Sequence, residues 1–191
     1  MSVAGIAVAL FVSTNLDDVF VLLAFFADPR FRPREIVVGQ LFGILLLASG
    51  SWALSRGATV LPPHLVGWLG IAPALLGIWM FVRKKDDDAS PTKRLGVLAV
   101  AGVTIANGAD NVAAYVPFFA IRTWAESLVV MGVFAAMTLV WCLFAHRLVH
   151  HRTLGAPLRR WGGRVLPFVL VALGIWIFVE AGTYRTLVLV P

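Results

Sequence analysis

The chain has 191 residues, of which 60% are hydrophobic and only 14% are charged, and its formal net charge is +6. Ordinary soluble domains carry about 25% charged residues, so the composition and its long apolar runs exclude such a domain and predict an integral membrane protein. The basic residues lie in short connections between the apolar runs, without a stripe of interleaved aromatic residues. The positive charge therefore indicates orientation in a lipid bilayer and excludes nucleic-acid binding.

Six apolar segments follow one another along the chain, and each is close to the roughly 20 residues that cross the hydrocarbon core of a membrane. They are Val3–Ala27, Ile36–Leu54, Leu65–Val82, Leu95–Ala120, Leu128–Ala145 and Val165–Ala181. This pattern predicts an all-α integral membrane protein with six transmembrane helices. The first segment has no basic region before it and continues past two aspartates, so we expect a mature transmembrane helix and not a cleaved leader.

Lysine and arginine residues are distributed unevenly between the connections. Thirteen of the 16 lie in the first, third and fifth connections, and the other three are Arg56, Arg122 and Arg185. The positive-inside rule then places the first, third and fifth connections in the cytoplasm. With six crossings, both termini are expected outside.

The two halves of the chain repeat one another. A shift of 93 residues places Asp17–Val19 on Asp110–Val112, and a shift of 97 places Gly77–Val82 on Gly174–Val179. Each half has three segments, which is an odd number, so the second half is expected to cross the membrane in the opposite sense, as in the inverted repeats of many transporters. We predict one transmembrane domain over residues 1–191, with repeat one at 1–82, a cytoplasmic linker at 83–94 and repeat two at 95–191.

Two polar motifs interrupt the apolar runs at related positions of the repeat. Thr14–Asp18 lies in the first segment and Asn107–Asn111 lies in the fourth. A charge at the middle of a membrane helix costs on the order of 2.5–3.5 kcal/mol, so such residues are rarely present for packing alone. In each motif, polar residues at positions i, i+3 and i+4 share one face of a helix. Gly108 also allows a local break that exposes main-chain carbonyls.

Together the motifs predict a binding site for a divalent metal cation, because hard cations prefer carboxylate and carbonyl oxygens. The expected ligands are three carboxylates and three carboxamides: Asp17, Asp18, Asp110, Asn15, Asn107 and Asn111. The ion is expected as the transported substrate, and neither a catalytic residue nor a resident cofactor is expected. Protons compete with a metal for the same oxygens, so coupling of transport to protons is an open alternative.

Other polar residues within the apolar segments are interpreted as structural. For Gln40, in the second segment, a role in helix packing is favoured over a role in the transport path. Cys142 is the single cysteine of the chain, which excludes an intramolecular disulfide, and we expect it to be a small core residue. His146 and His150 are expected to form a solvated basic end of the fifth segment.

The two motifs resemble those of the bacterial cadmium-resistance transporter (CadD-type) family, which belongs to the LysE-type exporter superfamily. Family members carry a Thr-Asn-Ile-Asp-Asp motif where this sequence has Thr14–Asp18, and an Ile-Ala-Asn-Gly-Gly-Asp-Asn motif within the stretch that corresponds to Thr104–Asn111. The resemblance covers nearly the whole chain. It implies a small bacterial inner-membrane protein that exports cadmium or a similar divalent cation, with the same six Asp and Asn positions as its site.

Alternatives remain at the level of the sequence. The oxygen ligand set suits manganese, calcium or magnesium better than soft cadmium, although cadmium is close to calcium in size. The main hypothesis is export of the divalent cation by alternating access around the Asp/Asn site, and export of a small organic cation or amino acid is a second hypothesis. A metal-dependent membrane enzyme or a non-transporting membrane protein is a third, for which the sequence offers no nucleophile–base pair. A homodimer is open, since small six-helix transporters can dimerise but no motif here requires it.

Overall fold

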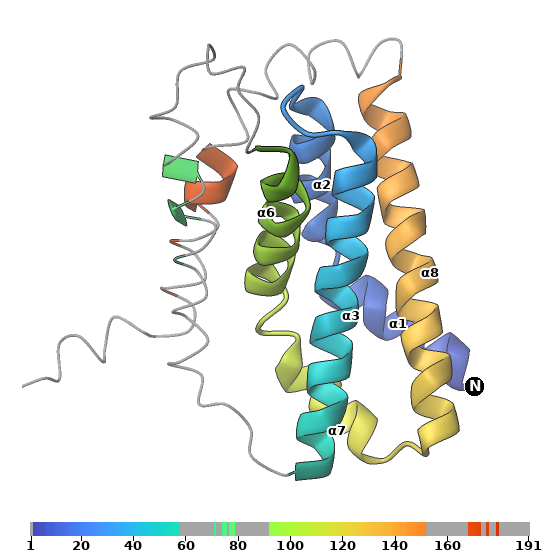
Figure 1. Cartoon of the computed structure of the whole chain (residues 1–191). Coiled ribbons are helices and arrows are strands. Elements are labelled where there is room, and N and C mark those ends of the chain that lie inside the picture. The colour runs from blue at the N-terminus through green and yellow to red at the C-terminus, as the bar shows by residue number, and fades with distance from the viewer. Residues whose placement is uncertain are drawn as a thin grey trace, which may run out of the picture.

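The computed structural model describes residues 2–57 and 92–151, together with short pieces between residues 71 and 78 and between residues 168 and 179. Within these residues the chain is helical and contains no β-strand (Figure 1). The helices are α1 (Val3–Thr14), α2 (Asp18–Ala27), α3 (Pro33–Gly57), α6 (Thr92–Asn107), α7 (Val112–Ala120) and α8 (Trp124–Val149). The predicted all-α class is confirmed for this part of the chain.

Two of these helices, α3 and α8, are long and apolar enough to cross a membrane unaided. They contain the second and fifth predicted segments and extend them by a few residues at each end. Each of these helices has a glutamate in its first turn, and its carboxylate accepts a hydrogen bond from the main-chain N–H three residues earlier. Glu35 Oε2 lies 3.1 Å from Arg32 N, and Glu126 Oε2 lies 2.9 Å from Thr123 N. These caps fix where each long helix starts after its connection.

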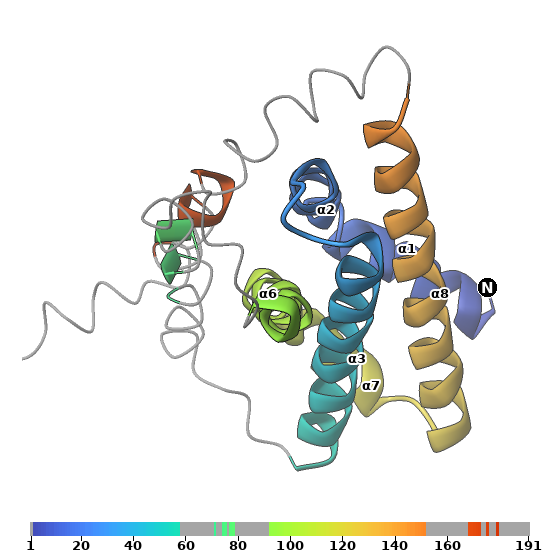
Figure 2. The same cartoon turned by 45° about the horizontal axis from the view of Figure 1, so that its top comes forward.

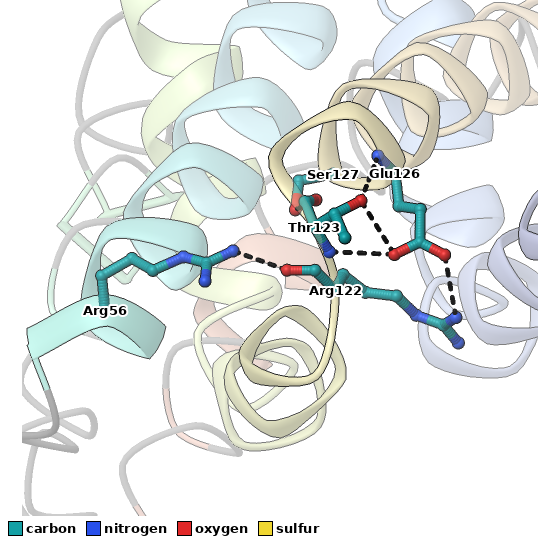
Figure 3. A network of polar contacts seen from close by, with 5 residues as sticks. All are labelled: Arg56, Arg122, Thr123, Glu126 and Ser127. Atoms are coloured by element: carbon teal, nitrogen blue, oxygen red, sulfur yellow. Dashed lines mark hydrogen bonds and ion pairs between the residues drawn. The ribbon is translucent and has the colours of Figure 1, made fainter.

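The connection before α8 is held by a further polar network (Figure 3). Thr123 and Glu126 form a complete capping box, and Arg122 lies 3.9 Å from the Glu126 carboxylate. Arg56, near the end of α3, donates a hydrogen bond of 2.7 Å from Nη2 to the main-chain oxygen of Arg122. The end of α3 is therefore tied to the corner between α7 and α8.

The first and fourth predicted segments are each broken into two helices. The helices α1 and α2 meet at an angle of 67°, and α6 and α7 meet at 76°. The expectation of one continuous helix through Val3–Ala27 is wrong, whereas the local break expected near Gly108 is present. At the end of α1 the side chains of Thr14 and Asn15 donate to carbonyls of the preceding turn, and such side-chain bonds compete with helix continuation.

Each long helix packs against the bent pair of the other half of the chain. The main contacts of α3 are with α6 and α7, those of α8 are with α1 and α2, and α3 also contacts α8 and, less extensively, α2. Figures 1 and 2 show α3 and α8 as neighbours, with α6 beside α3. If each bent pair is counted as one span, the described residues supply up to four candidate spans.

Glycines allow the closest of these contacts, between α3 and α6. A Cβ atom added to Gly39 would lie 2.7 Å from the main-chain oxygen of Val97, and one added to Gly43 would lie 2.6 Å from Cβ of Thr104. Both distances are too short for a real side chain, so the spacing of Gly39 and Gly43 works as a small-xxx-small packing motif. Gln40 lies between these two glycines in the sequence and is buried against α6.

The buried apolar side chains form two clusters. The first, here called cluster A, takes its residues mainly from α2, α6, the first part of α3 and the last part of α8, with Leu22, Phe25, Ile36 and Val103 among them. Cluster B takes its residues from α1, α7, the later part of α3 and the first part of α8, with Phe11, Ile44, Tyr115 and Phe134 among them. Each cluster therefore uses one member of each bent pair, and the two helix breaks lie between the clusters.

Several predictions concern residues outside the described part of the chain. Most of the segments Leu65–Val82 and Val165–Ala181 lies there, together with most of the linker at 83–94. Most of the repeat that contains Gly77–Val82 lies there as well. The number of six transmembrane helices and the inverted repeat therefore stay predictions. The described helix α6 begins at Thr92, which is inside the predicted linker.

Candidate functional site

Asn107, the last residue of α6, connects the two polar motifs. Its side-chain Nδ2 donates hydrogen bonds of 2.9 Å to Asp17 Oδ2 and 2.7 Å to Asp18 Oδ1. Asp17 and Asp18 lie at the start of α2, about ninety positions away in the sequence. The structure therefore brings three of the six predicted ligands into direct contact. Asp17 and Asp18 lie at the break between α1 and α2, and Asn107 lies at the break between α6 and α7. The expected face of one continuous helix is therefore not present at α1 and α2.

Asp18 is buried, with 3% of its surface exposed, and both of its carboxylate oxygens accept hydrogen bonds. Asn107 occupies Oδ1, and Gln40 Nε2 donates to Oδ2 over 2.9 Å. Gln40 Oε1 in turn lies 2.6 Å from the hydroxyl oxygen of Thr104. A chain of polar contacts thus runs from α6 through α3 to α2. Gln40 contacts a predicted site residue directly, and the same hydrogen bonds join α3 to α2 and α6, as expected of a helix-packing role.

Asn15 lies in the break between α1 and α2 and is 1% exposed. Its Nδ2 is 2.9 Å from the carbonyl oxygen of Phe11 and 2.8 Å from the hydroxyl of Tyr115. The carbonyl can only accept, which fixes the orientation of the amide. Within the described residues, Asn15 Oδ1 is buried without a hydrogen-bond partner. An unpartnered buried acceptor costs on the order of 1–3 kcal/mol, and a carboxamide oxygen is one of the groups that ligate hard cations.

Two aromatic residues that the sequence interpretation did not include support this break. The Tyr115 hydroxyl also lies 3.1 Å from the hydroxyl of Thr14, and Tyr115 is fully buried. Trp141 on α8 donates from Nε1 to the main-chain oxygen of Asn15 over 2.9 Å. The available signal was an aromatic residue with a polar group inside an apolar segment, which on its own does not identify a partner.

The remaining predicted ligands lie at the second break, between α6 and α7. Asp110 is exposed, and its Oδ1 accepts a hydrogen bond of 3.0 Å from the main-chain N–H of Asn111. Asn111 is largely buried. Among the described residues, no three His, Cys, Asp or Glu side chains lie close enough together to hold a metal ion. The joint ligation of one ion by Asp17, Asp18 and Asp110 therefore stays a prediction.

The chemistry of the two breaks is that of hard oxygen donors. The breaks bring together carboxylates, carboxamides and the main-chain carbonyls at the ends of α1 and α6, which are the oxygen types that hard cations prefer. Cys142, the only thiol of the chain, is buried in cluster A and packs with apolar residues of α2 and α8. The arrangement thus supports binding of a cation by oxygen ligands at the level where both membrane segments bend.

Comparison with known proteins adds one finding. A family model described as "Cadmium resistance transporter" matches residues 11–190, which include both polar motifs and all described helices beyond the first turns of α1. No curated protein and no solved structure shows a significant match to the chain.

Proposed function

The chain belongs to the cadmium resistance transporter family, and from this premise we propose that it exports a divalent cation through a site at the two helix breaks. The family and the long apolar helices indicate that the chain is a multi-pass membrane protein and a metal transporter. We assign the bacterial inner membrane as its location and the cation as its substrate, with no resident cofactor. The observation that carries the proposal is the contact of Asn107 with Asp17 and Asp18 across the two breaks.

Two further observations support the choice of a cation. The pair of adjacent aspartates concentrates negative charge inside apolar segments, where it is costly without a compensating charge or donor. Asn15 Oδ1 adds a buried oxygen without a partner in the described part of the chain. We propose Asp17, Asp18 and Asp110 as charged ligands and Asn15, Asn107 and Asn111 as neutral ones. In the structure Asn107 presents its N–H groups to the carboxylates, so it has to rotate to offer its oxygen.

The proposed mechanism is alternating access around this site. The reciprocal packing of α3 and α8 on the opposite bent pairs supports two inverted halves. Clusters A and B lie on opposite sides of the breaks and are suited to close the path to one side of the membrane at a time. Carboxylates that release a metal can take up protons. We therefore propose that export of the cation is coupled to uptake of protons at the same carboxylates.

Oxygen ligands define the class of cation and do not select cadmium. Calcium and manganese favour such ligands, and cadmium is close enough to calcium in size to share the site. Cys142 lies in apolar cluster A and is not part of the proposed set of cation ligands. The substrate class is therefore a divalent cation of medium to large radius.

The test is metal flux in sealed proteoliposomes that contain the purified protein. Asp18→Asn keeps the size of the side chain and removes its charge, and we expect a loss of Cd²⁺ and Mn²⁺ flux of at least about tenfold. Glu126→Gln makes the same chemical change at the exposed start of α8 and should keep wild-type flux. Wild-type flux in Asp18→Asn would overturn the assignment of the site. Flux of amino acids but not of metals in the wild-type protein would favour export of an organic substrate.

A further inference from the structure

The two amides that hold Asp18 differ in how firmly the fold fixes them. Asn107 ends α6 at the break and shares its N–H groups with the exposed Asp17. Gln40 lies within α3, far from either end of that helix. Each carboxylate oxygen of Asp18 keeps a lone pair for an ion, but the N–H donor takes up part of its charge. Asn107, at the break, is the donor better placed to move aside, and its movement leaves Oδ1 the stronger ligand.

Gln40, by contrast, is fixed from both sides. Its Nε2 faces the Asp18 carboxylate, and its Oε1 accepts from the hydroxyl of Thr104 over 2.6 Å. The close approach of α3 and α6 at Gly39 and Gly43 holds the backbone on either side of Gln40 close to α6. Gln40 is therefore held beside Asp18 Oδ2 from α3, next to its second partner Thr104 on α6.

We propose that Gln40 acts through Asp18 as a positioning residue that sets the size selectivity of the cation site. With Oδ2 bonded to Gln40, Oδ1 is the stronger oxygen ligand that Asp18 offers to an incoming ion, and bidentate binding is weakened. Large cations such as Ca²⁺ take high coordination numbers and bidentate carboxylates, whereas small octahedral cations take one oxygen from each carboxylate. Gln40 therefore biases the site against bidentate binding with high coordination numbers, and so against Ca²⁺ relative to Mn²⁺. This inference rests on the proposed function.

Replacing Gln40 should release the second oxygen of Asp18. Gln40→Met keeps the length of the side chain and removes the amide donor. Thr104→Val removes the hydroxyl that orients the Gln40 amide and leaves Gln40 in place, so we expect a smaller shift in the same direction. Thr138→Val is the matched control, because Thr104 and Thr138 are both buried and both lie within hydrogen-bond distance of the carbonyl four residues earlier, at 2.9 and 2.8 Å.

The experiment measures how well Ca²⁺ and Mn²⁺ compete with Cd²⁺ for flux in proteoliposomes. In Gln40→Met the ratio of Ca²⁺ to Mn²⁺ apparent affinity should rise about tenfold, which corresponds to about 1.4 kcal/mol. Thr138→Val should keep the wild-type ratio. An unchanged ratio in Gln40→Met with Cd²⁺ flux preserved would overturn the inference. If Gln40→Met is not monodisperse after purification, the ratio in Thr104→Val decides in the same way.

Failure of the underlying function is distinguishable from failure of this inference. A wild-type protein that moves none of these three metals contradicts cation export itself. A wild-type protein that moves Cd²⁺, together with variants whose selectivity ratio does not change, contradicts only the role of Gln40.

Discussion

Removal of the Asn107 side chain should destabilise the metal-free protein measurably. Its Nδ2 makes two hydrogen bonds to carboxylates, of 2.7 Å to the buried Asp18 and 2.9 Å to the exposed Asp17. A hydrogen bond to a buried charged group contributes about 1.5–3 kcal/mol. The bond to Asp17 is screened by solvent and contributes about 0.5 kcal/mol. We therefore expect Asn107→Ala to lower the free energy of unfolding by about 2–3.5 kcal/mol.

The cost should depend on the charge of Asp18. In an Asp18→Asn background the carboxylate that accepts from Asn107 is absent. The same Asn107→Ala change should then lower the free energy of unfolding by about 1 kcal/mol or less. The measurement is a double-mutant cycle of denaturant-induced unfolding in detergent micelles with a chelator present. Asn111→Ala is the matched control, because Asn111 bonds Asp110 through its main-chain N–H, which the substitution keeps. Equal costs in the two backgrounds would refute the reasoning that Asn107 compensates the charge of Asp18.

Three further predictions test other parts of the structure. Gly43→Ala should lower the unfolding free energy by about 1–3 kcal/mol in the same assay, because the added Cβ would lie 2.6 Å from Thr104, whereas Gly50→Ala, which meets nothing within 4 Å, should be close to neutral. Cys142→Ala should keep cadmium tolerance in a growth assay, since the thiol packs in an apolar cluster, and loss of tolerance with normal protein levels would contradict oxygen-only ligation. Tyr115→Phe should cost about 1 kcal/mol of unfolding free energy, because it removes the hydroxyl that accepts from Asn15, and an unchanged value would show that this bond adds no stability.

The proximity of the two polar motifs could be predicted from the sequence because of the unusual cost of charge in a membrane. Asp17 and Asp18 are separated from other charges by apolar residues, and a shift of 93 residues points to the second motif. The contact of Asn107 with both aspartates is the structural counterpart of this relation. Such reasoning works because few positions in an apolar segment tolerate a carboxylate without a functional partner.

The break between α1 and α2 and the role of Gln40 could not be predicted in the same way. Hydropathy is continuous through Val3–Ala27, and the hydrogen bonds of Thr14 and Asn15 that end α1 depend on side-chain orientation, which periodicity does not contain. Gln40 is one polar residue on a helix, and its direction follows from the approach of α3 to α6 and not from local sequence. Residues that act through tertiary contacts need the fold before they can be assigned.

The reciprocal packing of the long helices groups the described helices into two packed units that each draw on both halves of the sequence. One unit is α3 with α6 and α7, and the other is α8 with α1 and α2. The units meet where α3 contacts α8 and α2, and the hydrogen bonds of Asp18 with Gln40 and Asn107 cross between them. Under the proposed alternating access, a cross-link between α3 and α8 should therefore stop transport, whereas one between α8 and α1 should leave it running.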